Sequence, residues 1–240
     1  MTARLVFHDP RGRVTALAVA TLLAACGSPP PDSFHTLRGP AGTRSEETRP
    51  TASVLGIGPV TVPQALERPG WLVREGPTAM RVYEHQLWTQ DLDVEIAQAL
   101  ADDLDAGPGA AARPWADPAP PGALLSPSIA PAGALRVRVQ VLRFDSRLAP
   151  EAGVSDAVRW TLECGATDGS GWQVLGGAVR TADVPATLGP ATDAEAGVRF
   201  DGLAAAHAQA IARVAADIAE ALDQTAAVRN ERCVLPVSHP

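Results

Sequence analysis

The sequence contains no lysine, and all 20 of its basic residues are arginine. Against them stand 27 acidic residues, which leave a formal net charge of −7 at pH 7. Because proteins bind nucleic acids mainly by neutralising phosphates, this acidic balance argues against nucleic acid as a partner. The use of arginine alone, together with abundant alanine, glycine and proline, is typical of GC-rich coding and carries no functional information.

Catalytic and metal-binding motifs are also missing. The sequence has no His-x-x-x-His or Cys-x-x-Cys spacing, so a zinc site is poorly supported. It also has no Gly-x-Ser-x-Gly elbow and no phosphate-binding P-loop. Aromatic residues make up only 4% of the chain, so a core must be built mainly from Val, Leu, Ile and Ala. We therefore predict a protein that is not an enzyme and has no metal or cofactor.

Two patterns could suggest chemistry, and each has a simpler interpretation. The run Gly56-Ile57-Gly58 lacks the third glycine of a dinucleotide loop and is followed by Pro59, which favours a bulged strand over a phosphate loop. Two acidic trios lie within residues 91–95 and 102–105 of one expected helix. Like charges at this spacing favour a solvated face or helix N-terminus over a general acid–base pair.

A single long uncharged apolar run is present, at residues 14–25 (VTALAVATLLAA). It is too short for a membrane-spanning helix, which needs roughly 20 apolar residues, but it fits the core of a signal peptide. Arginines precede it, and it ends in Leu-Ala-Ala followed by Cys26, the lipobox pattern of bacterial lipoproteins. We predict that residues 1–25 are a signal peptide removed before Cys26, which then carries a covalent lipid. An ordinary secretory signal with a chance cysteine is the alternative.

The residue after Cys26 is Gly27 rather than the aspartate that retains many such proteins in the inner membrane. This favours the periplasmic face of the outer membrane, and two or three acyl chains would anchor the protein firmly there. Residues 26–52 are polar and rich in proline, glycine and threonine, which predicts a lipidated flexible tether. Within this tether, Phe34 and Leu37 are the residues suited to joining the body as a short strand.

The body is predicted to span residues 53–233, followed by a tail at 234–240. Strand patterns occur at 54–62, 71–74, 80–83, 135–145, 158–164 and 172–181, and helical periodicity at 89–106 and 201–224. A proline-rich loop, with an edge strand near Ala112, separates the two halves at 108–134. This order predicts an α+β fold in which two helices pack on one face of a mainly antiparallel sheet.

Once Cys26 is assigned to the lipid, Cys164 and Cys233 remain. In an oxidising compartment they either form a disulfide or remain two separate thiols. Pairing requires Cα atoms within roughly 7 Å of each other. The sequence leaves both possibilities open.

The body resembles the PqiC-type family, the auxiliary lipoproteins of ABC-type and MCE-protein transport systems. The resemblance covers about residues 53–223 and is clearest at 54–63 (VLGIGPVTVP) and 66–69 (LERP). It continues at Leu87-Trp88, in the strand at 138–144 (RVQVLRF), and in the closing helix at 205–219. The proline-rich insert at 108–134 and the stretch at 71–83 depart from the family pattern, and both departures could alter a partner surface.

This resemblance implies a non-catalytic accessory role. The protein would sit at the inner face of the outer membrane, receive an MCE-domain protein of an intermembrane lipid transport system, and self-associate into an oligomer. A separate ATPase would supply the energy. Candidate partner-binding residues are Gly58, Pro59, Arg68 and Trp88, although the glycine and proline could serve backbone geometry and Trp88 the core. The loop at 108–134 is the most exposed candidate, and a spacer explains it equally well.

Two other functions remain open from the sequence. The first is a different envelope module, such as an assembly factor or scaffold lipoprotein, which would share the anchor and fold class. The second is a lipid-anchored hydrolase whose catalytic residues are dispersed along the chain. Only the partner, or a reactive nucleophile, would separate these from the transport role.

Overall fold

The structure is a computed structural model that describes residues 31–39, 55–106, 112–114, 133–166, 171–188, 196–226 and 233. It divides the chain into two compact units, residues 1–32 and 33–240, and the second contains all the helices and strands considered below. The predicted signal peptide, Cys26, most of the proline-rich loop and the tail at 234–240 lie outside the described residues.

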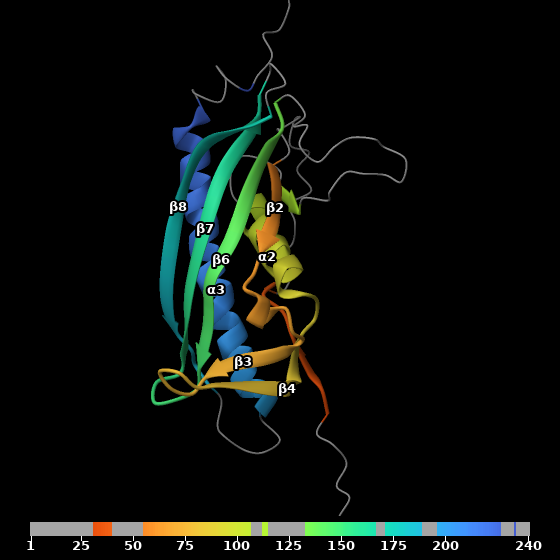
Figure 1. The fold of residues 1–240 in the computed structure, drawn as a ribbon, viewed down its shortest axis with the longest axis vertical. Helices are drawn as coiled ribbons and strands as arrows, with labels where there is room; N and C mark the ends of the chain where they lie inside the picture. The colour runs from red at the N-terminus through yellow and green to blue at the C-terminus, as the bar shows by residue number, and fades with distance from the viewer. Residues whose placement is uncertain are drawn as a thin grey trace, which may run out of the picture. The chain divides into compact units, whose positions relative to one another are not determined.

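A three-stranded antiparallel meander forms the main part of the sheet (Figure 1). It consists of β6 (Leu135–Arg147), β7 (Gly153–Gly165) and β8 (Trp172–Pro185). Along β6 the apolar residues Leu135, Val137 and Val139 are buried while Arg138 is exposed, as expected for a strand with one face on the core. The alternation predicted from the sequence is confirmed here, and β7 and β8 extend further than expected.

The other edge of β6 carries two shorter groups of strands. β2 (Leu55–Thr61) runs parallel to β6 and is itself paired with β5 (Ala112–Pro114). β3 (Gly70–Arg74) meets β6 at Ser146 and continues through β4 (Met80–Trp88) to β1 (Ser33–His35). The sheet is therefore mixed: its longest ladders are antiparallel and its short pairings with β6 are parallel.

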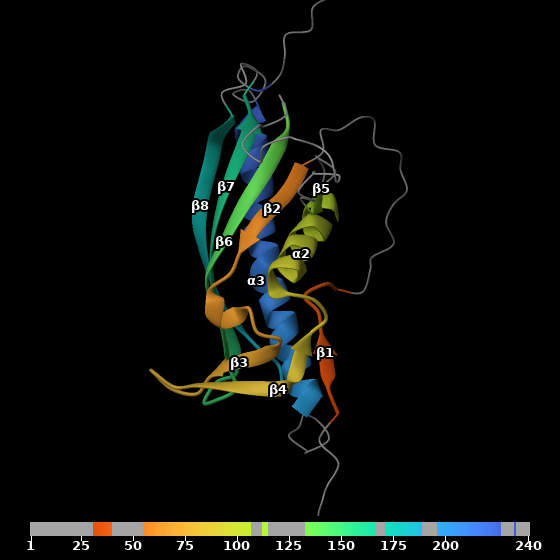
Figure 2. The ribbon, with the colours of Figure 1, turned by 45° about the vertical axis from the view of Figure 1, so that its right-hand side comes forward.

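Helices α2 (Leu92–Ala106) and α3 (Ala196–Gln224) cover one face of this sheet (Figure 2). α2 packs on β2 and β5, α3 packs on β7 and β8, and the helices also touch each other. The stripe that predicted each helix is buried, including Ile96 and Leu100 on α2 and Ile211 and Ile218 on α3. The predicted α+β class, with two helices on one face, is confirmed.

The start of the body differs from the prediction. Residues 33–39 were assigned to the tether, with Phe34 and Leu37 suited to joining the body as a short strand. In the structure Ser33–His35 forms β1 and pairs with β4, and Leu37 is buried in the core. The ordered body therefore begins at Ser33 rather than at residue 53. The apolar pair Phe34 and Leu37 was the signal for this strand, but a three-residue strand without its own periodicity is decided by the β4 edge beside it.

Candidate functional site

An open cleft of about 800 Å³ lies where β2 ends and α2 begins. Two stretches of chain line it, residues 60–69 and residues 88–94. The first stretch turns because Pro63 precedes a short 3-10 helix, η1 (Gln64–Leu66), and the second turns because β4 stops at Trp88 before α2 starts. The carbonyl oxygen of Asp91 accepts the N–H groups of Val94 and Glu95, each at 3.0 Å, which sets the first turn of α2.

The cleft brings together two of the four predicted partner-binding residues. Arg68 and Trp88 both line it, although they are far apart in the sequence. Gly58 and Pro59 do not line it, and instead form the irregularity in β2 just before Val60. Gly58 has a φ of 133°, which only glycine adopts readily, so this residue serves backbone geometry.

The lining combines an apolar surface with charged groups. Its apolar members include Val60, Val62, Leu66, Trp88 and Leu92, and its charged members are Glu67, Arg68, Asp91 and Asp93. No histidine, cysteine or serine is among the described residues that line it, and its hydroxyl groups are those of Thr61 and Thr89. A lining that combines apolar and charged side chains suits the binding of a ligand or partner.

Trp88 connects the cleft to a buried polar network. Its ring stacks on Trp71 with centroids 4.1 Å apart, and the indole N–H of Trp71 donates a hydrogen bond of 2.8 Å to Ser146 Oγ. Ser146 Oγ lies 2.8 Å from His207 Nε2, and His207 Nδ1 lies 2.8 Å from Asp156 Oδ2. The network links β3, β6, β7 and α3 in the interior between the two apolar clusters of the body.

The order Ser146–His207–Asp156 is that of a serine hydrolase triad. Ser146 and His207 are both 0% exposed, however, and Asp156 is 2% exposed. A substrate carbonyl cannot reach a hydroxyl with no exposed surface, and that hydroxyl already accepts the Trp71 hydrogen bond. The network therefore has the geometry of a triad but serves as an internal polar brace.

Asp156 is the member of this network whose carboxylate is least well compensated for its burial. Burial raises the pKa of its carboxyl group, His207 opposes this rise, and the nearby Asp145 and Asp183 add to it. Its Oδ1 atom is buried without a hydrogen-bond partner among the described residues. The carboxylate thus depends on a single bond to His207 for its stabilisation.

The raised pKa makes a testable contribution to the pH dependence of stability. Because the folded protein holds the Asp156 proton more tightly than the unfolded chain, this group stabilises the fold below pH 3.8 and loses that contribution as pH rises through the raised pKa. We expect Asp156→Asn to remove this slope, at most about 1.4 kcal/mol per pH unit for one proton. Urea unfolding of both proteins at a series of acidic pH values measures it.

The control for this measurement is Asp223→Asn, an exposed carboxylate on α3 that is not among the groups raising the Asp156 pKa. Its pH profile should follow that of the unmodified protein. Equal slopes for the unmodified protein and Asp156→Asn would show that the Asp156 carboxyl titrates alike in the folded and unfolded states.

Comparison with known proteins decides the family of this chain. The family model described as ABC-type transport auxiliary lipoprotein component matches residues 35–219. The chain belongs to this family. The match covers the whole sheet from the end of β1 and most of α3, so it includes both stretches that line the cleft. Membership of this family makes the auxiliary lipoprotein a component of a transport system, and it argues against the alternative of a lipid-anchored hydrolase.

Solved structures share the fold of this auxiliary lipoprotein at low sequence identity. An uncharacterised protein matches with a TM-score of 0.53 and 18% identity over 80% of this chain and 98% of its own. A DUF330-family protein from Xanthomonas campestris matches with a TM-score of 0.53 and 16% identity over 85% of this chain and 98% of its own. No curated protein matches the chain at a significant level.

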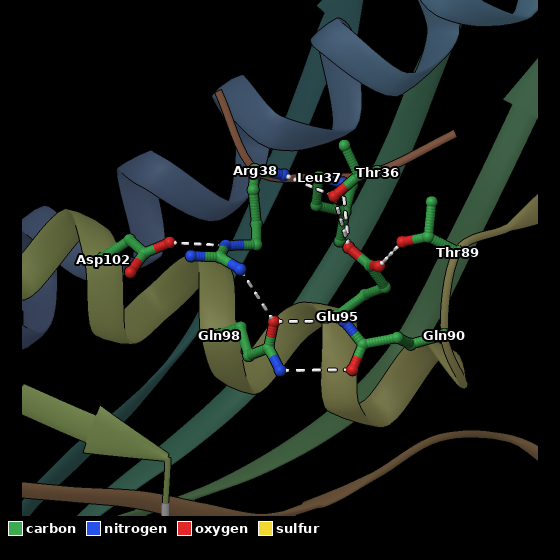
Figure 3. Close-up of polar contacts among 8 residues, drawn as sticks. All are labelled: Thr36, Leu37, Arg38, Thr89, Gln90, Glu95, Gln98 and Asp102. Atoms are coloured by element: carbon green, nitrogen blue, oxygen red, sulfur yellow. Dashed lines mark hydrogen bonds and ion pairs between the residues drawn. The ribbon is translucent and has the colours of Figure 1, made fainter. Parts of the chain in front are cut away.

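A second polar cluster in the auxiliary lipoprotein centres on Glu95 (Figure 3). One carboxylate oxygen of Glu95 accepts the Thr36 hydroxyl at 2.8 Å and the Leu37 N–H at 3.1 Å, and the other accepts the Thr89 hydroxyl. For this acidic trio the sequence predicted a solvated face or a helix N-terminus. Glu95 lies in the first turn of α2, as the second interpretation requires, but it is 0% exposed and therefore not on a solvated face. The sequence could not reveal this because the groups that satisfy Glu95 come from segments distant along the chain or outside the helix.

The same side of α2 holds the N-terminal segment at its surface. Arg38 donates to Asp102 at 2.7 Å and to Gln98 at 3.3 Å, and Gln98 exchanges hydrogen bonds with Gln90 (Figure 3). His35 of β1 is buried and bonds Gln86 and Asp201 at 2.8 Å each. Residues 35–38 are therefore attached to β4, α2 and α3 together.

Cys164 and Cys233 are joined by a disulfide, with Cα atoms 6.0 Å apart. The bond links the end of β7 to a residue beyond α3, so of the two possibilities left open by the sequence the structure has the disulfide.

Among the described residues, no helix is long and apolar enough to cross a membrane. Nor do any three His, Cys, Asp or Glu side chains of the described chain lie close enough together to hold a metal ion.

Proposed function

We propose that this protein is an outer-membrane-anchored, periplasmic accessory subunit of an MCE/ABC-type intermembrane lipid transport system. Membership of the auxiliary lipoprotein family supports the transport role. The lipobox at residues 23–26 supports a covalent lipid on Cys26, with no other cofactor. The role we propose is non-catalytic, which agrees with the description of the family as an auxiliary component and with the burial of Ser146, His207 and Asp156.

The observation that carries this proposal is the convergence of family-like motifs on one cleft. The turn at 66–69 and Trp88 belong to different parts of the chain, yet they line the same cavity. Its apolar surface and charged groups have the mixed composition of a protein-binding site. We propose that a polypeptide segment of the MCE-domain partner binds here, with its apolar side chains against Trp88 and Leu66 and its polar groups near Arg68 and Asp91.

Self-association of this subunit would match a partner that is itself a ring. A ring of accessory subunits would present several copies of the cleft, which raises the effective affinity for a multivalent partner. A different envelope scaffold would share the anchor and fold, and it would differ in the protein found at the cleft.

In-cell cross-linking of the tagged full chain tests this function. We expect an MCE-domain protein to be recovered, and we expect Arg68→Glu or Leu66→Ser to reduce its yield about tenfold, since each alters a cleft residue that is at least partly exposed. Arg213→Glu, the same charge change at an exposed site on α3, is the control and should leave the yield unchanged. Recovery of an outer-membrane assembly barrel or peptidoglycan machinery instead would overturn the transport proposal.

A further inference from the structure

Charge is segregated between the two faces of the sheet. On the covered face, α2 carries five acidic residues and no basic one, and α3 adds Asp217, Glu220 and Asp223 near its C-terminal end. The opposite face of β6–β8, which faces the viewer in Figure 1 and is left uncovered by the helices, carries exposed arginines. This is unexpected in a chain of net charge −7.

We call this surface the arginine face, and it consists of Arg138, Arg143, Arg147 and Arg159. All four are exposed. Arg143 donates to Ser155 at 3.2 Å and Arg159 to Gln140 at 2.8 Å, and neither forms an ion pair with a described carboxylate. Arg147 likewise has no ion pair within the described chain, and Arg138 lies 3.6 Å from a Glu163 oxygen.

The carboxylates on the same face only partly offset this charge. Glu163 is buried and held by Arg136 at 2.7 Å, and Asp145 is held by Arg74 at 2.8 Å. Asp183 is exposed on β8, away from Arg138 and Arg159 in the strand register. The arginines of this face that have no ion pair with a described carboxylate are Arg143 and Arg147 in the second half of β6 and Arg159 in the middle of β7.

Exposed apolar side chains lie among these arginines. Leu142 is 40% exposed at the β6 bulge, and Val174 and Val179 on β8 are 60% and 52% exposed. Val179 stands directly opposite Arg159 in the register. Basic groups interspersed with exposed apolar groups are the composition of surfaces that lie on an anionic bilayer.

The start of β1 lies close in the sequence to the predicted lipid anchor at Cys26. Only six residues lie between Cys26 and Ser33, where the ordered body begins. Even fully extended, this stretch spans at most about 25 Å. A lipid on Cys26 would therefore hold the body beside the bilayer surface, where the acidic helices are repelled by anionic lipid and the arginine face is attracted.

We propose that the arginine face binds the phosphate headgroups of anionic phospholipids at the membrane that carries the anchor. The guanidinium groups of Arg138, Arg143 and Arg159 pair with phosphate oxygens, while Val174 and Val179 enter the boundary between headgroups and acyl chains. This site is separate from the cleft, so the body can lie on lipid while the cleft holds a partner. The inference rests on the proposed lipid anchor at Cys26.

The test places a photo-cross-linking amino acid at Val179 in the lipidated full chain, reconstituted in nanodiscs. The matched control places it at Ala219, an exposed position on α3. With phosphatidylglycerol present, we expect the phospholipid adduct at position 179 to exceed that at 219 severalfold. The excess should fall at high ionic strength and in nanodiscs of phosphatidylcholine alone.

Variants that neutralise arginines test whether the arginine face causes the lipid adduct. Arg143→Gln with Arg159→Gln should reduce the adduct at position 179 about 25-fold, which is about fivefold for each arginine near an anionic surface. Arg213→Gln should not change it. Equal adducts at 179 and 219, no dependence on phosphatidylglycerol, or an adduct of Val179 with protein instead of lipid would each overturn the proposal.

Whether Cys26 carries a lipid is tested by a separate measurement. Mass spectrometry of the peptide that begins at Cys26 shows whether acyl chains are attached. If they are absent, the anchor proposal fails, and the Val179 adduct measured on added phosphatidylglycerol vesicles still decides whether the arginine face binds lipid.

Discussion

Replacing His207 by alanine is expected to lower the free energy of unfolding by about 3–5 kcal/mol. The imidazole is 0% exposed and is the only described group that bonds the buried carboxylate of Asp156. Its removal leaves that carboxylate without any hydrogen bond and opens a cavity beside Phe144, whose ring stacks on His207 at 3.7 Å. Urea denaturation followed by circular dichroism measures the change.

Two further variants separate the polar loss from the packing loss. In the His207→Ala background, Asp156→Asn should recover part of the stability, because it removes the uncompensated buried charge. Ser146→Ala should cost less, about 1–3 kcal/mol, since it leaves only Trp71 and His207 each short of one partner. If His207→Ala costs under about 1 kcal/mol, the network is not the brace described above.

Replacing Glu95 by alanine is expected to cost about 2–4 kcal/mol and to detach the N-terminal segment from the body. The Leu37 N–H and the Thr36 and Thr89 hydroxyls all lose their acceptor, two of them at partly buried positions and one at a buried position. We expect limited proteolysis to cut near residues 36–39 in this variant before the rest of the body unfolds. Mass spectrometry of the fragments locates the cut.

Glu95→Gln is the isosteric control, because its amide oxygen retains an acceptor, and Asp93→Ala tests the loss of charge on the same helix. Both should protect residues 36–39 better than Glu95→Ala does. Unchanged protection of this segment in Glu95→Ala would mean that β1 is held by His35 and its strand pairing with β4 rather than by Glu95.

Release of β1 would affect the proposed function, because β1 fixes the length of chain between Cys26 and the ordered body. While β1 is attached, about 25 Å of extended chain at most separates the body from Cys26. If β1 is released from β4, it no longer limits the length of chain between Cys26 and the body, and the body can move further from the bilayer. The buried carboxylate thus controls how closely the arginine face is held to lipid, under the proposed anchor.

The sequence by itself determined the features that depend on local pattern. Period-two alternation over residues 135–141 placed the first half of β6 with Arg138 and Gln140 outward, because neighbouring strand residues point to opposite faces. Four-residue spacing over residues 92–104 placed α2, because such residues share one helix face. The order of these elements was enough to predict an α+β fold with both helices on one side.

Only the tertiary structure decided what depends on long-range contact. It made β1 part of the body, buried Glu95 between segments remote in sequence, and joined Ser146, His207 and Asp156 from three separate elements. It also brought Arg68 and Trp88 to one cleft and left Gly58 outside it. Hydrogen-bond partners and burial are properties of the packed chain, and no periodicity along the sequence specifies which distant groups will meet.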